Sequence, residues 1–367
     1  MTRLQDLYQQ QGQSPWLDNL RRDWIRSGEL ARWVERGVRG VTSNPSIFQK
    51  AIEGQEVYDE EFAATINGGG SVEDAYWQVV TTDISDAIAV LRPVYDDSDG
   101  ADGFVSVEVA PNLARDTAGT TAAARRLHAD IDQPNLFVKI PGTAEGLPAI
   151  RQVIADGKSV NITLLFSRQR YDEVIEAYLS GLEAAEGSLA PIASVASFFV
   201  SRVDTEVDRR LEAIGTDEAL ALRGRAAVAQ AKLAYQLFRD AHTGARWERL
   251  ADRGARVQRP LWASTSTKNP DYPDTLYVDT LIGPDTVNTM PEATLDAFED
   301  HGTLARTVDA DPDAAQRTLD AIEAVGVDLD EVSRVLEDQG VATFAKSFDE
   351  LISALEAKAE STPGGSG

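Results

Sequence analysis

The chain has 367 residues, of which 43% are hydrophobic, and it carries 60 Asp and Glu against 35 Lys and Arg. This length is near that of two average domains, but it also suits one α/β barrel with insertions, and the apolar content is that of a globular chain. The formal net charge of -25 argues against nucleic-acid binding, which needs a basic face. The absence of cysteine excludes disulfides, zinc–thiolate sites, iron–sulfur clusters and a cysteine nucleophile.

Signals for metal binding, secretion and membrane insertion are weak. The three histidines, His128, His242 and His301, lie far apart, and no HExxH motif occurs. The first residues, Met-Thr-Arg-Leu-Gln, form no apolar signal-peptide core, and no stretch approaches 18 apolar residues. We therefore expect a cytoplasmic protein with no metal site and no membrane partner. The composition leaves the choice between monomer and homodimer open.

Eight short apolar runs alternate with longer amphipathic segments. The runs predict strands at Ser14–Asn19, Gly40–Pro45, Gly103–Ala110, Leu136–Pro141, Ser159–Ser167, Pro191–Val200, Arg259–Thr265 and Tyr277–Pro284. Helical patterns lie between them, for instance at Gly28–Arg36, Val72–Leu91, Asp116–Ile131, Ala144–Ala155 and Arg168–Ala185. Eight such units favour an α/β fold of the (β/α)8 TIM-barrel type. A doubly wound sheet is the alternative, but no GxGxxG follows a strand and no Walker A motif occurs.

Two regions are longer than a barrel requires. Residues 206–253 predict one or two extra helices before the seventh strand, and residues 292–360 predict a barrel helix followed by a C-terminal helical extension. No linker long enough to divide the chain is visible, so we expect a single domain over residues 1–360. Residues 361–367 have the composition of a disordered tail.

Polar residues fall on one face of the central predicted strands. Successive strand side chains point to opposite faces. In the third strand Ser106 and Glu108 alternate with valines, in the fourth Lys139 alternates with aliphatic residues, and in the fifth Asn161 and Thr163 do the same. In a barrel the polar face would point inward near the carboxyl ends of the strands, where barrel enzymes keep their sites.

Lys139 is the most informative single residue, because Leu-Phe-Val-Lys-Ile-Pro must be buried in a barrel wall. Burial disfavours a charged ammonium, and a free amine attacks carbonyls to form a Schiff base. The alternative is a lysine that guards an edge strand or pairs with a buried carboxylate for register alone. A closed barrel has no edges, which favours the functional interpretation. Lys158, at the start of the fifth strand, lies at the opposite end and is expected to be solvated.

Two carboxylates are candidate acid/base groups. Glu108 lies one strand from Lys139, although it could serve only as its ion-pair partner. Asp18 ends the first run, where it could instead cap the following helix. The amide of Asn161 and the hydroxyl of Thr163 are weak signals alone, because such groups inside barrels often satisfy only local hydrogen bonds.

A phosphate-binding end is predicted beyond the sixth and seventh strands. The segment Ala-Ser-Thr-Ser-Thr-Lys-Asn (263–269) clusters hydroxyls with one lysine near a strand end, as a phosphate cradle does. Arg202, just after the sixth strand, could supply a forked contact. Taken alone, each feature is better explained as part of a solvated loop.

Taken together, these segments resemble the transaldolase family. The matching stretches are Gly-Val-Thr-Ser-Asn-Pro-Ser-Ile-Phe (40–48), Val-Ser-Val-Glu-Val (105–109), Val-Lys-Ile-Pro-Gly-Thr (138–143), Asn-Ile-Thr-Leu-Leu-Phe-Ser (161–167), Ala-Ser-Phe-Phe-Val-Ser-Arg-Val-Asp (196–204) and Trp-Ala-Ser-Thr (262–265). They run in order from the second strand to the seventh, and Asp18 extends the match to the first. The length and the extra helices resemble the longer, bacterial subgroup.

The resemblance implies a (β/α)8 barrel and assigns roles to residues. The family's Schiff-base lysine matches Lys139, its acid/base carboxylates match Asp18 and Glu108, and the threonine that shares a catalytic water with Glu108 matches Thr163. Groups that bind the sugar hydroxyls or the Schiff-base carbons match Asn44, Ser106, Asn161 and Ser197, and phosphate ligands match Arg202 and Ser264. One departure concerns the arginine that short-form members place soon after the serine equivalent to Ser264, because this chain offers Ser266 and Lys268 instead.

The implied reaction is transfer of a dihydroxyacetone unit between sugar phosphates in the non-oxidative pentose phosphate pathway. Sedoheptulose 7-phosphate or fructose 6-phosphate would donate the unit, and a second aldose phosphate would accept it. The Schiff base is itself the electron sink, so the resemblance implies neither a metal nor an organic cofactor.

Two rival functions remain. A fructose 6-phosphate aldolase-type enzyme shares the barrel and the lysine, but those smaller relatives have a tyrosine where this chain has Phe199, so Phe199 favours transfer. A non-catalytic barrel that only binds sugar phosphates would need a lost lysine or carboxylate, and both are present.

Overall fold

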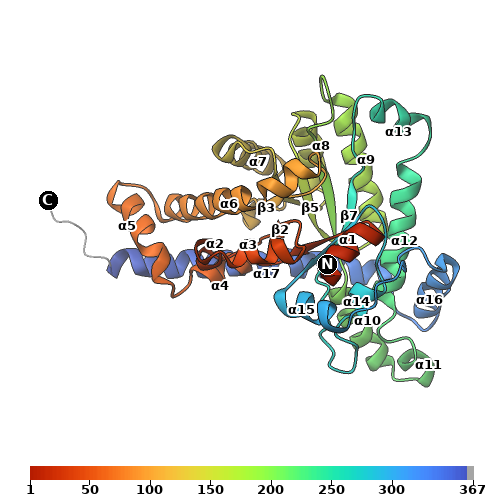
Figure 1. The fold of residues 1–367 in the computed structure, drawn as a ribbon. Coiled ribbons are helices and arrows are strands. Elements are labelled where there is room, and N and C mark those ends of the chain that lie inside the picture. Colours follow the sequence, from red (N-terminus) through yellow and green to blue (C-terminus); the bar gives the residue numbers. More distant parts are fainter. Residues whose placement is uncertain (362–367) are drawn as a thin grey trace.

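The structure is a computed structural model, and it describes residues 1–361. Eight parallel strands pair in sequence order and close into a barrel, which confirms the predicted (β/α)8 fold (Figure 1). The strands are β1 (Gln13–Leu17), β2 (Val41–Thr42), β3 (Val105–Glu108), β4 (Leu136–Pro141), β5 (Val160–Leu165), β6 (Ser194–Phe199), β7 (Arg259–Ala263) and β8 (Thr286–Met290).

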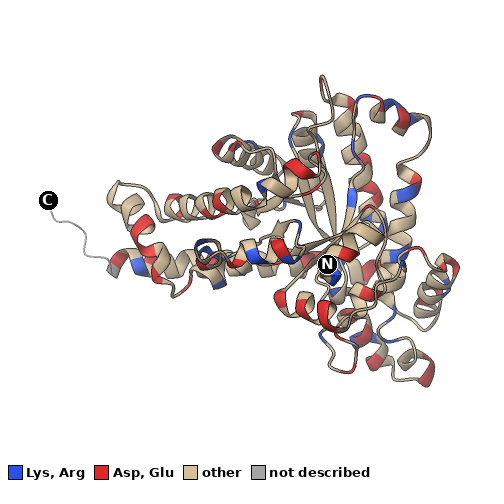
Figure 2. Ribbon diagram, viewed as in Figure 1, with Lys and Arg blue, Asp and Glu red and all other residues tan. Residues whose placement is uncertain are grey.

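Helices form the outer layer, the insertions and the end of the described chain. They are α1 (Arg3–Gln11), α2 (Arg22–Ser27), α3 (Glu29–Arg36), α4 (Pro45–Ile52), α5 (Asp59–Asn67), α6 (Val72–Asp97), α7 (Thr117–Ile131), α8 (Gly146–Ala155), α9 (Arg168–Ala184), α10 (Ser201–Ile214), α11 (Asp217–Leu220), α12 (Ala226–Ala241), α13 (Gly244–Ala251), α14 (Leu276–Asp279), α15 (Glu292–His301), α16 (Pro312–Ala324) and α17 (Leu329–Ser361), with the short 3-10 helices η1 (Glu56–Tyr58) and η2 (Pro111–Leu113). Acidic residues are spread over many of these helices (Figure 2). No helix in the described range is long and apolar enough to cross a membrane.

The predicted eighth strand at Tyr277–Pro284 is wrong. That run contains α14 and a turn, and the barrel is completed by β8, which begins at Thr286. The run is apolar because Leu281 and Ile282 are buried, while the carbonyl of Leu281 accepts hydrogen bonds from the Trp262 indole at 3.1 Å and from the Gln13 amide at 2.7 Å. The polar residues of β8, which are Thr286, Asn288 and Thr289, do not alternate strictly with apolar ones, and they concealed a strand whose side chains are all buried.

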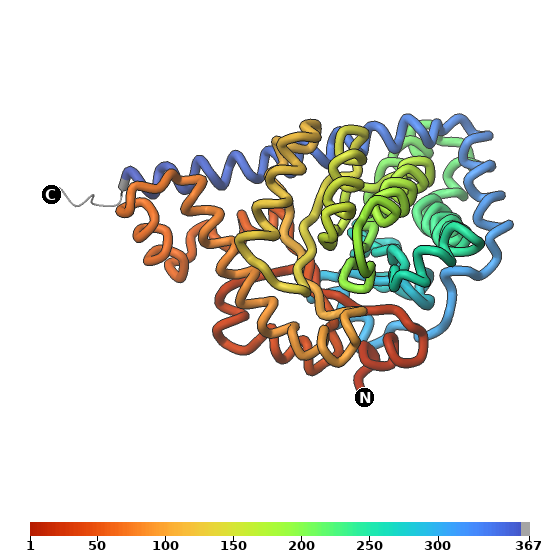
Figure 3. Tube along the Cα trace, turned by 90° about the horizontal axis from the view of Figure 1, so that it is seen from above, coloured from red at the N-terminus to blue at the C-terminus, as the bar shows by residue number. Residues whose placement is uncertain are grey.

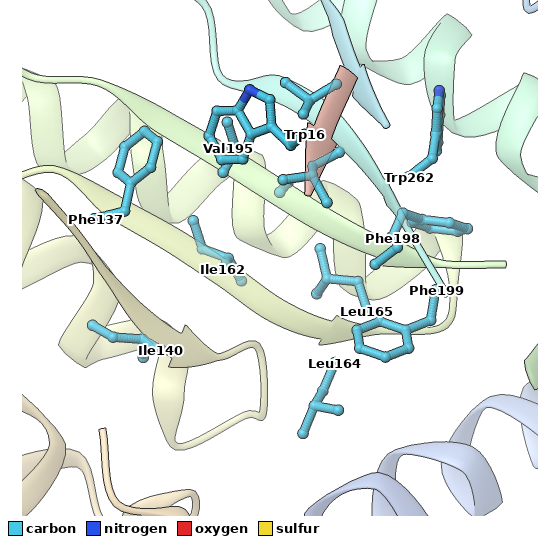
Figure 4. Packing of buried hydrophobic residues seen from close by; sticks show 14 of the residues in the cluster. Trp16, Phe137, Ile140, Ile162, Leu164, Leu165, Val195, Phe198, Phe199 and Trp262 are labelled. Carbon is cyan, nitrogen blue, oxygen red and sulfur yellow. The ribbon is translucent and has the colours of Figure 1, made fainter. Parts of the chain in front are cut away.

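The strand parity also breaks once, in β5. The pairing with β6 shifts between Ile162 and Leu165, and Leu164 has a φ of 61°. Such a bulge places two residues of one strand opposite one of its neighbour. Leu164 therefore leaves the alternation that the sequence predicts, and its side chain lies toward α17, where a Cβ on Gly340 would come within 2.9 Å of it (Figure 4).

The extra helices occupy the two regions that the sequence indicates. Residues 206–253 contain the rest of α10 and then α11, α12 and α13, more helices than the one or two expected. The C-terminal region contains α15, α16 and the 33-residue α17. In Figure 3 α17 runs as one long rod across the molecule, and it contacts α4, α6, α10 and β5. The predicted tail at 361–367 lies outside the described residues, apart from Ser361, which ends α17.

Large side chains fill the amino-terminal end of the barrel. Trp16 and Phe137 are buried with ring centroids 6.1 Å apart (Figure 4), and Phe104 stacks on Phe137 at 4.1 Å. Residue 40 must be glycine here, since a Cβ would lie 2.3 Å from the Trp16 indole. Buried Asp102 accepts a hydrogen bond from the Trp16 indole at 2.8 Å. Because this end is packed solid, open space inside the barrel remains at the carboxyl ends of the strands.

Candidate active site

Lys139 lies in the middle of β4 with its side chain inside the barrel, only 6% exposed. Its Nζ atom is 3.0 Å from Oε2 of Glu108, the last residue of β3, and donates to the carbonyl oxygen of Ser43 at 3.0 Å. The two side chains meet because β3 and β4 pair in register, with Glu108 opposite Lys139. The sequence-predicted amine and carboxylate therefore form a buried ion pair at the carboxyl ends of neighbouring strands.

Asp18 follows β1 directly and lines the same cavity as Lys139. Its Oδ1 accepts a hydrogen bond from the Thr42 hydroxyl at 2.7 Å, and Thr42 in turn lies 2.6 Å from the hydroxyl of Thr289 on β8. These contacts hold the carboxyl group toward the barrel axis. Asp18 is therefore not merely a helix cap, since no side-chain cap bond starts α2.

Burial shifts the acid/base behaviour of both carboxyl groups. Removal from water raises the pKa of Glu108, against the opposing effect of the nearby Lys139 charge. Burial likewise raises the pKa of Asp18, while its hydrogen bond from Thr42 and the charge of Lys139 oppose that rise. Each group is thereby brought nearer to the pH at which it can both accept and return a proton.

A chain of hydrogen bonds fixes the polar residues on the wall beside Lys139. The Ser197 hydroxyl donates to Oδ1 of Asn161 at 2.7 Å, and the Asn161 amide donates to the Ser106 hydroxyl at 3.0 Å. The fully buried Thr163 hydroxyl has no hydrogen-bond partner within residues 1–361, and the Glu108 carboxyl oxygens accept no further hydrogen bond there. Thr163 and Glu108 thus keep hydrogen-bonding capacity beside the amine.

The predicted phosphate residues lie together at the mouth. Arg202 is the second residue of α10, and its guanidinium lies 5.0 Å from the centroid of the Phe199 ring. Ser264, which has a φ of 56°, has its hydroxyl 2.8 Å from that of Ser201. Lys268 donates to the hydroxyl of Ser266 at 2.7 Å.

A cavity of about 360 Å³ brings most of these residues together. Of the sequence-predicted site residues, those that line it are Asp18, Asn44, Lys139, Thr163, Ser197, Phe199, Arg202, Ser264, Ser266 and Lys268. The other three lie behind the lining: Glu108 contacts Lys139, Asn161 contacts Ser197, and Ser106 contacts Asn161. A primary amine at the floor with a carboxyl group on either side can form an iminium with a ketone and move protons around it.

The eight lining residues that were not among the predicted site residues are Thr42, Ser46, Ile47, Lys50, Ala263, Thr289, Pro291 and Phe344. Thr42 and Thr289 support Asp18, Lys50 comes from α4, and Phe344 comes from α17, where its ring centroid is 5.8 Å from the Arg202 guanidinium. Thr42 has the same strand parity as Asn44 and could have been found from that signal. Thr289 was missed with its strand, and Lys50 and Phe344 carry no strand signal because they belong to helices.

Comparison with known proteins identifies the family. The family profile described as Transaldolase/Fructose-6-phosphate aldolase matches residues 15–355, which includes every barrel strand except the first residues of β1. The chain belongs to this family.

Within the family, the similar curated proteins are transaldolases. A transaldolase from Thermobifida fusca is 54% identical over 346 residues, which cover 93% of this chain and 94% of the relative. Transaldolase 1 of Streptomyces coelicolor is 53% identical, covering 94% and 92%, and a transaldolase of Mycobacterium leprae is 51% identical, covering 95% of each. The chain is an enzyme of the transaldolase type.

Proposed function

We propose that this enzyme transfers a dihydroxyacetone unit from a ketose phosphate to an aldose phosphate through a Schiff base on Lys139, as a step of the non-oxidative pentose phosphate pathway. The observation that carries the proposal is the position of the Lys139 amine at the cavity floor, 3.0 Å from Glu108 and on the same cavity as Asp18. The donors are sedoheptulose 7-phosphate and fructose 6-phosphate.

Glu108 serves the formation and breakdown of the covalent bond. It takes the proton that Lys139 must lose, and the neutral amine adds to the ketone carbon to give a carbinolamine. Glu108 then returns a proton so that the carbinolamine hydroxyl leaves as water and the iminium forms. The support for this role is the ion pair and the raised pKa of Glu108. A water between Glu108 and the unpartnered Thr163 hydroxyl relays the proton.

Asp18 serves the cleavage of the carbon–carbon bond. Its carboxylate removes the proton of the C4 hydroxyl, the C3–C4 bond breaks, and the bonding electrons enter the iminium to give an enamine. An aldose phosphate leaves, and the enamine carbon later attacks the aldehyde of the acceptor, with Asp18 returning the proton. This role is supported by two observations: Asp18 lines the same cavity as Lys139, and its carboxyl group is held by Thr42.

Three cations at the mouth bind the substrate phosphate. Arg202, Lys268 and Lys50 line the same cavity, and none of them has an ion-pair partner within the described chain. The pKa of Lys268 is lowered by partial burial and by the neighbouring charges of Arg202 and Lys50. A cluster of like charges without a counter-ion favours an anion. Lys268 and Lys50 thus replace the arginine of the short-form members.

The aldolase alternative differs in what happens to the enamine. Phe199 packs against Phe166 with centroids 5.1 Å apart and has no hydroxyl with which to protonate an enamine. An enamine that is not protonated stays attached to Lys139 until it attacks the aldehyde of an acceptor. Phe199 therefore supports transfer over net cleavage.

Borohydride trapping with fructose 6-phosphate, followed by peptide mapping, tests the proposal. Reduction should fix the substrate carbon onto Lys139 alone, and Lys139→Ala should abolish both labelling and transfer while the protein stays folded. Lys158, an exposed lysine just before β5, serves as the matched control, and Lys158→Ala should trap normally. A label on any other lysine, or transfer by Lys139→Ala, would contradict the assignment.

A further inference from the structure

The segment between β7 and α14 carries Ser264, Ser266 and Lys268 but has little regular structure of its own. At its start the backbone N–H of Ser201 donates to the carbonyl oxygen of Ser264 at 3.0 Å. The Lys268 amine contacts only Ser266 within the segment. The part of this segment that follows Lys268 is held by contacts of its own.

Two tyrosines supply that attachment, and both reach carboxyl groups on α10, the helix that begins beside Arg202. The hydroxyl of Tyr272 donates to Oδ2 of Asp208 at 2.5 Å, and the hydroxyl of Tyr277 donates to Oδ2 of Asp204 at 2.8 Å. Asp204 and Asp208 are one helical turn apart, so both acceptors lie on one face of α10.

The other oxygen of each carboxyl group accepts a hydrogen bond from a third segment, which comprises the turn before α12 and the first turn of that helix. Oδ1 of Asp208 accepts from the backbone N–H of Gly224 at 2.8 Å, and Oδ1 of Asp204 accepts from that of Ala227 at 2.8 Å. Gly224 has a φ of 69°, and a Cβ there would lie 2.7 Å from the Tyr272 ring. The ring is thus packed directly against the turn that precedes α12.

Both carboxyl groups are buried, 1% exposed for Asp204 and 8% for Asp208. Neither has an ion-pair partner in the part of the chain that the structure describes. Burying carboxyl groups with only neutral donors is unfavourable compared with an apolar contact. Because the fold contains this unfavourable burial, we infer that the two tyrosine–aspartate pairs have a role beyond joining the segments.

We propose that Tyr272 and Tyr277, held by Asp208 and Asp204, are positioning residues that set the distance between Lys268 and Arg202 at the phosphate end of the cavity. This proposal rests on the phosphate role given above to Arg202 and Lys268. Neither tyrosine lines the cavity. Tyr272 acts through the segment that carries Lys268, and Tyr277 acts through α14, which follows that segment.

The test is a double-mutant cycle between Tyr272→Phe and Lys268→Ala, measured with erythrose 4-phosphate and with unphosphorylated erythrose as acceptors. Tyr272→Phe keeps the ring and loses only the hydroxyl. It should raise KM for erythrose 4-phosphate about fivefold, leave kcat within about twofold, and leave erythrose unchanged, because a contact kept through the reaction affects binding uniformly. In the Lys268→Ala background Tyr272→Phe should add nothing.

Tyr235→Phe is the matched control. Tyr235 is a buried tyrosine whose hydroxyl donates to the carbonyl oxygen of Pro284 at 3.1 Å, ahead of β8 at the opposite end of the barrel. This substitution should lower stability at most and change neither acceptor's KM. If Tyr272→Phe does not fold, Asp208→Asn, which keeps one oxygen acceptor, replaces it in the cycle.

The outcomes separate the two proposals. If Lys268→Ala raises KM only for the phosphorylated acceptor but Tyr272→Phe does not, or if Tyr272→Phe has its full effect without Lys268, the positioning role is wrong and the phosphate assignment stands. If Lys268→Ala and an Arg202 variant weaken both acceptors equally, the phosphate end itself is misassigned and the positioning role is wrong with it.

Discussion

At the scale of single residues, the two carboxyl groups of the site differ in what holds them. Glu108 pairs with the amine itself, whereas Asp18 is held by a neutral hydroxyl of Thr42. A group paired with Lys139 is suited to proton transfer at the nitrogen, and a group across the cavity is suited to proton transfer at the substrate C4 hydroxyl. Because Glu108 and Asp18 act at different atoms, substitution of each should slow a different step of the reaction.

Glu108→Gln should slow the formation of the Schiff base, while Asp18→Asn should slow carbon–carbon cleavage and still allow trapping. Loss of one positioned acid/base group costs about 10²–10⁴ in rate. Single-turnover kinetics with borohydride quenching measures both steps. If Asp18→Asn blocks trapping and Glu108→Gln spares it, the two roles are reversed.

Substitution of Arg202 and substitution of Lys268 should lower kcat/KM to different degrees. Charge-assisted hydrogen bonds are worth about 1.5–3 kcal/mol each, so Arg202→Ala, which loses a forked pair, should lower kcat/KM for fructose 6-phosphate by about 10²–10⁴. Lys268→Ala should cost roughly tenfold, mostly in KM. Unphosphorylated fructose is the control, because it presents no anion. An equal fall on fructose would show that these residues shape the mouth instead.

The residues that could be predicted from the sequence lie on strands or in the segments that directly follow them. Glu108, Lys139 and Thr163 follow the inward parity, which is fixed by backbone geometry and needs no tertiary information. Lys50 and Phe344 reach the cavity from helices, and no periodicity shows that a helix near the end of the chain crosses the mouth. Contacts of that kind depend on the closed fold.

At the scale of elements, β8 and β5 show where pattern reading fails. In β8 the inward Thr289 hydroxyl lies close to that of Thr42, and Asn288 accepts a hydrogen bond from Thr265 at 2.8 Å. Because polar residues of these types are also typical of turns, the strand could not be recognised from the sequence. The bulge at Leu164 in β5 breaks the parity for a packing reason that lies in α17.

Asp204, which joins α10 to Ala227 of α12, should make the free energy of unfolding depend on pH. Burial raises the pKa of Asp204 to about 7 from 3.8. A raised pKa means that the folded state binds the proton more tightly than the unfolded state. This stabilisation is complete below about pH 4 and is lost as pH rises toward about 7, at about 1.4 kcal/mol per pH unit at most.

Urea unfolding between pH 4 and pH 7 measures this effect. The free energy of unfolding of the wild type should fall, relative to that of Asp204→Asn, as pH rises across this window. Asp74→Asn provides a control, because hydrogen bonds from Ser71 lower the pKa of that exposed group instead. A wild type and an Asp204→Asn variant with parallel profiles would contradict the raised pKa.

At the scale of the whole molecule, the alternation of strands and helices was enough to predict a closed barrel, because eight such units have few ways to bury their apolar faces. The acidic composition agrees with a surface whose cations mostly pair with carboxylates, for example Arg246 with Glu176 and Glu183. The cluster of Arg202, Lys268 and Lys50 differs from that pattern, and its three side chains line the cavity that also contains Lys139.

We propose that the enzyme holds the dihydroxyacetone unit covalently until an acceptor arrives. The most direct measurement is the amount of glyceraldehyde 3-phosphate released from fructose 6-phosphate when no acceptor is present, followed by a coupled assay from the time of mixing. We expect a burst of roughly one equivalent per active site and then no further release until erythrose 4-phosphate is added. Continuous release at the full turnover rate without an acceptor would contradict it and would make the enzyme an aldolase.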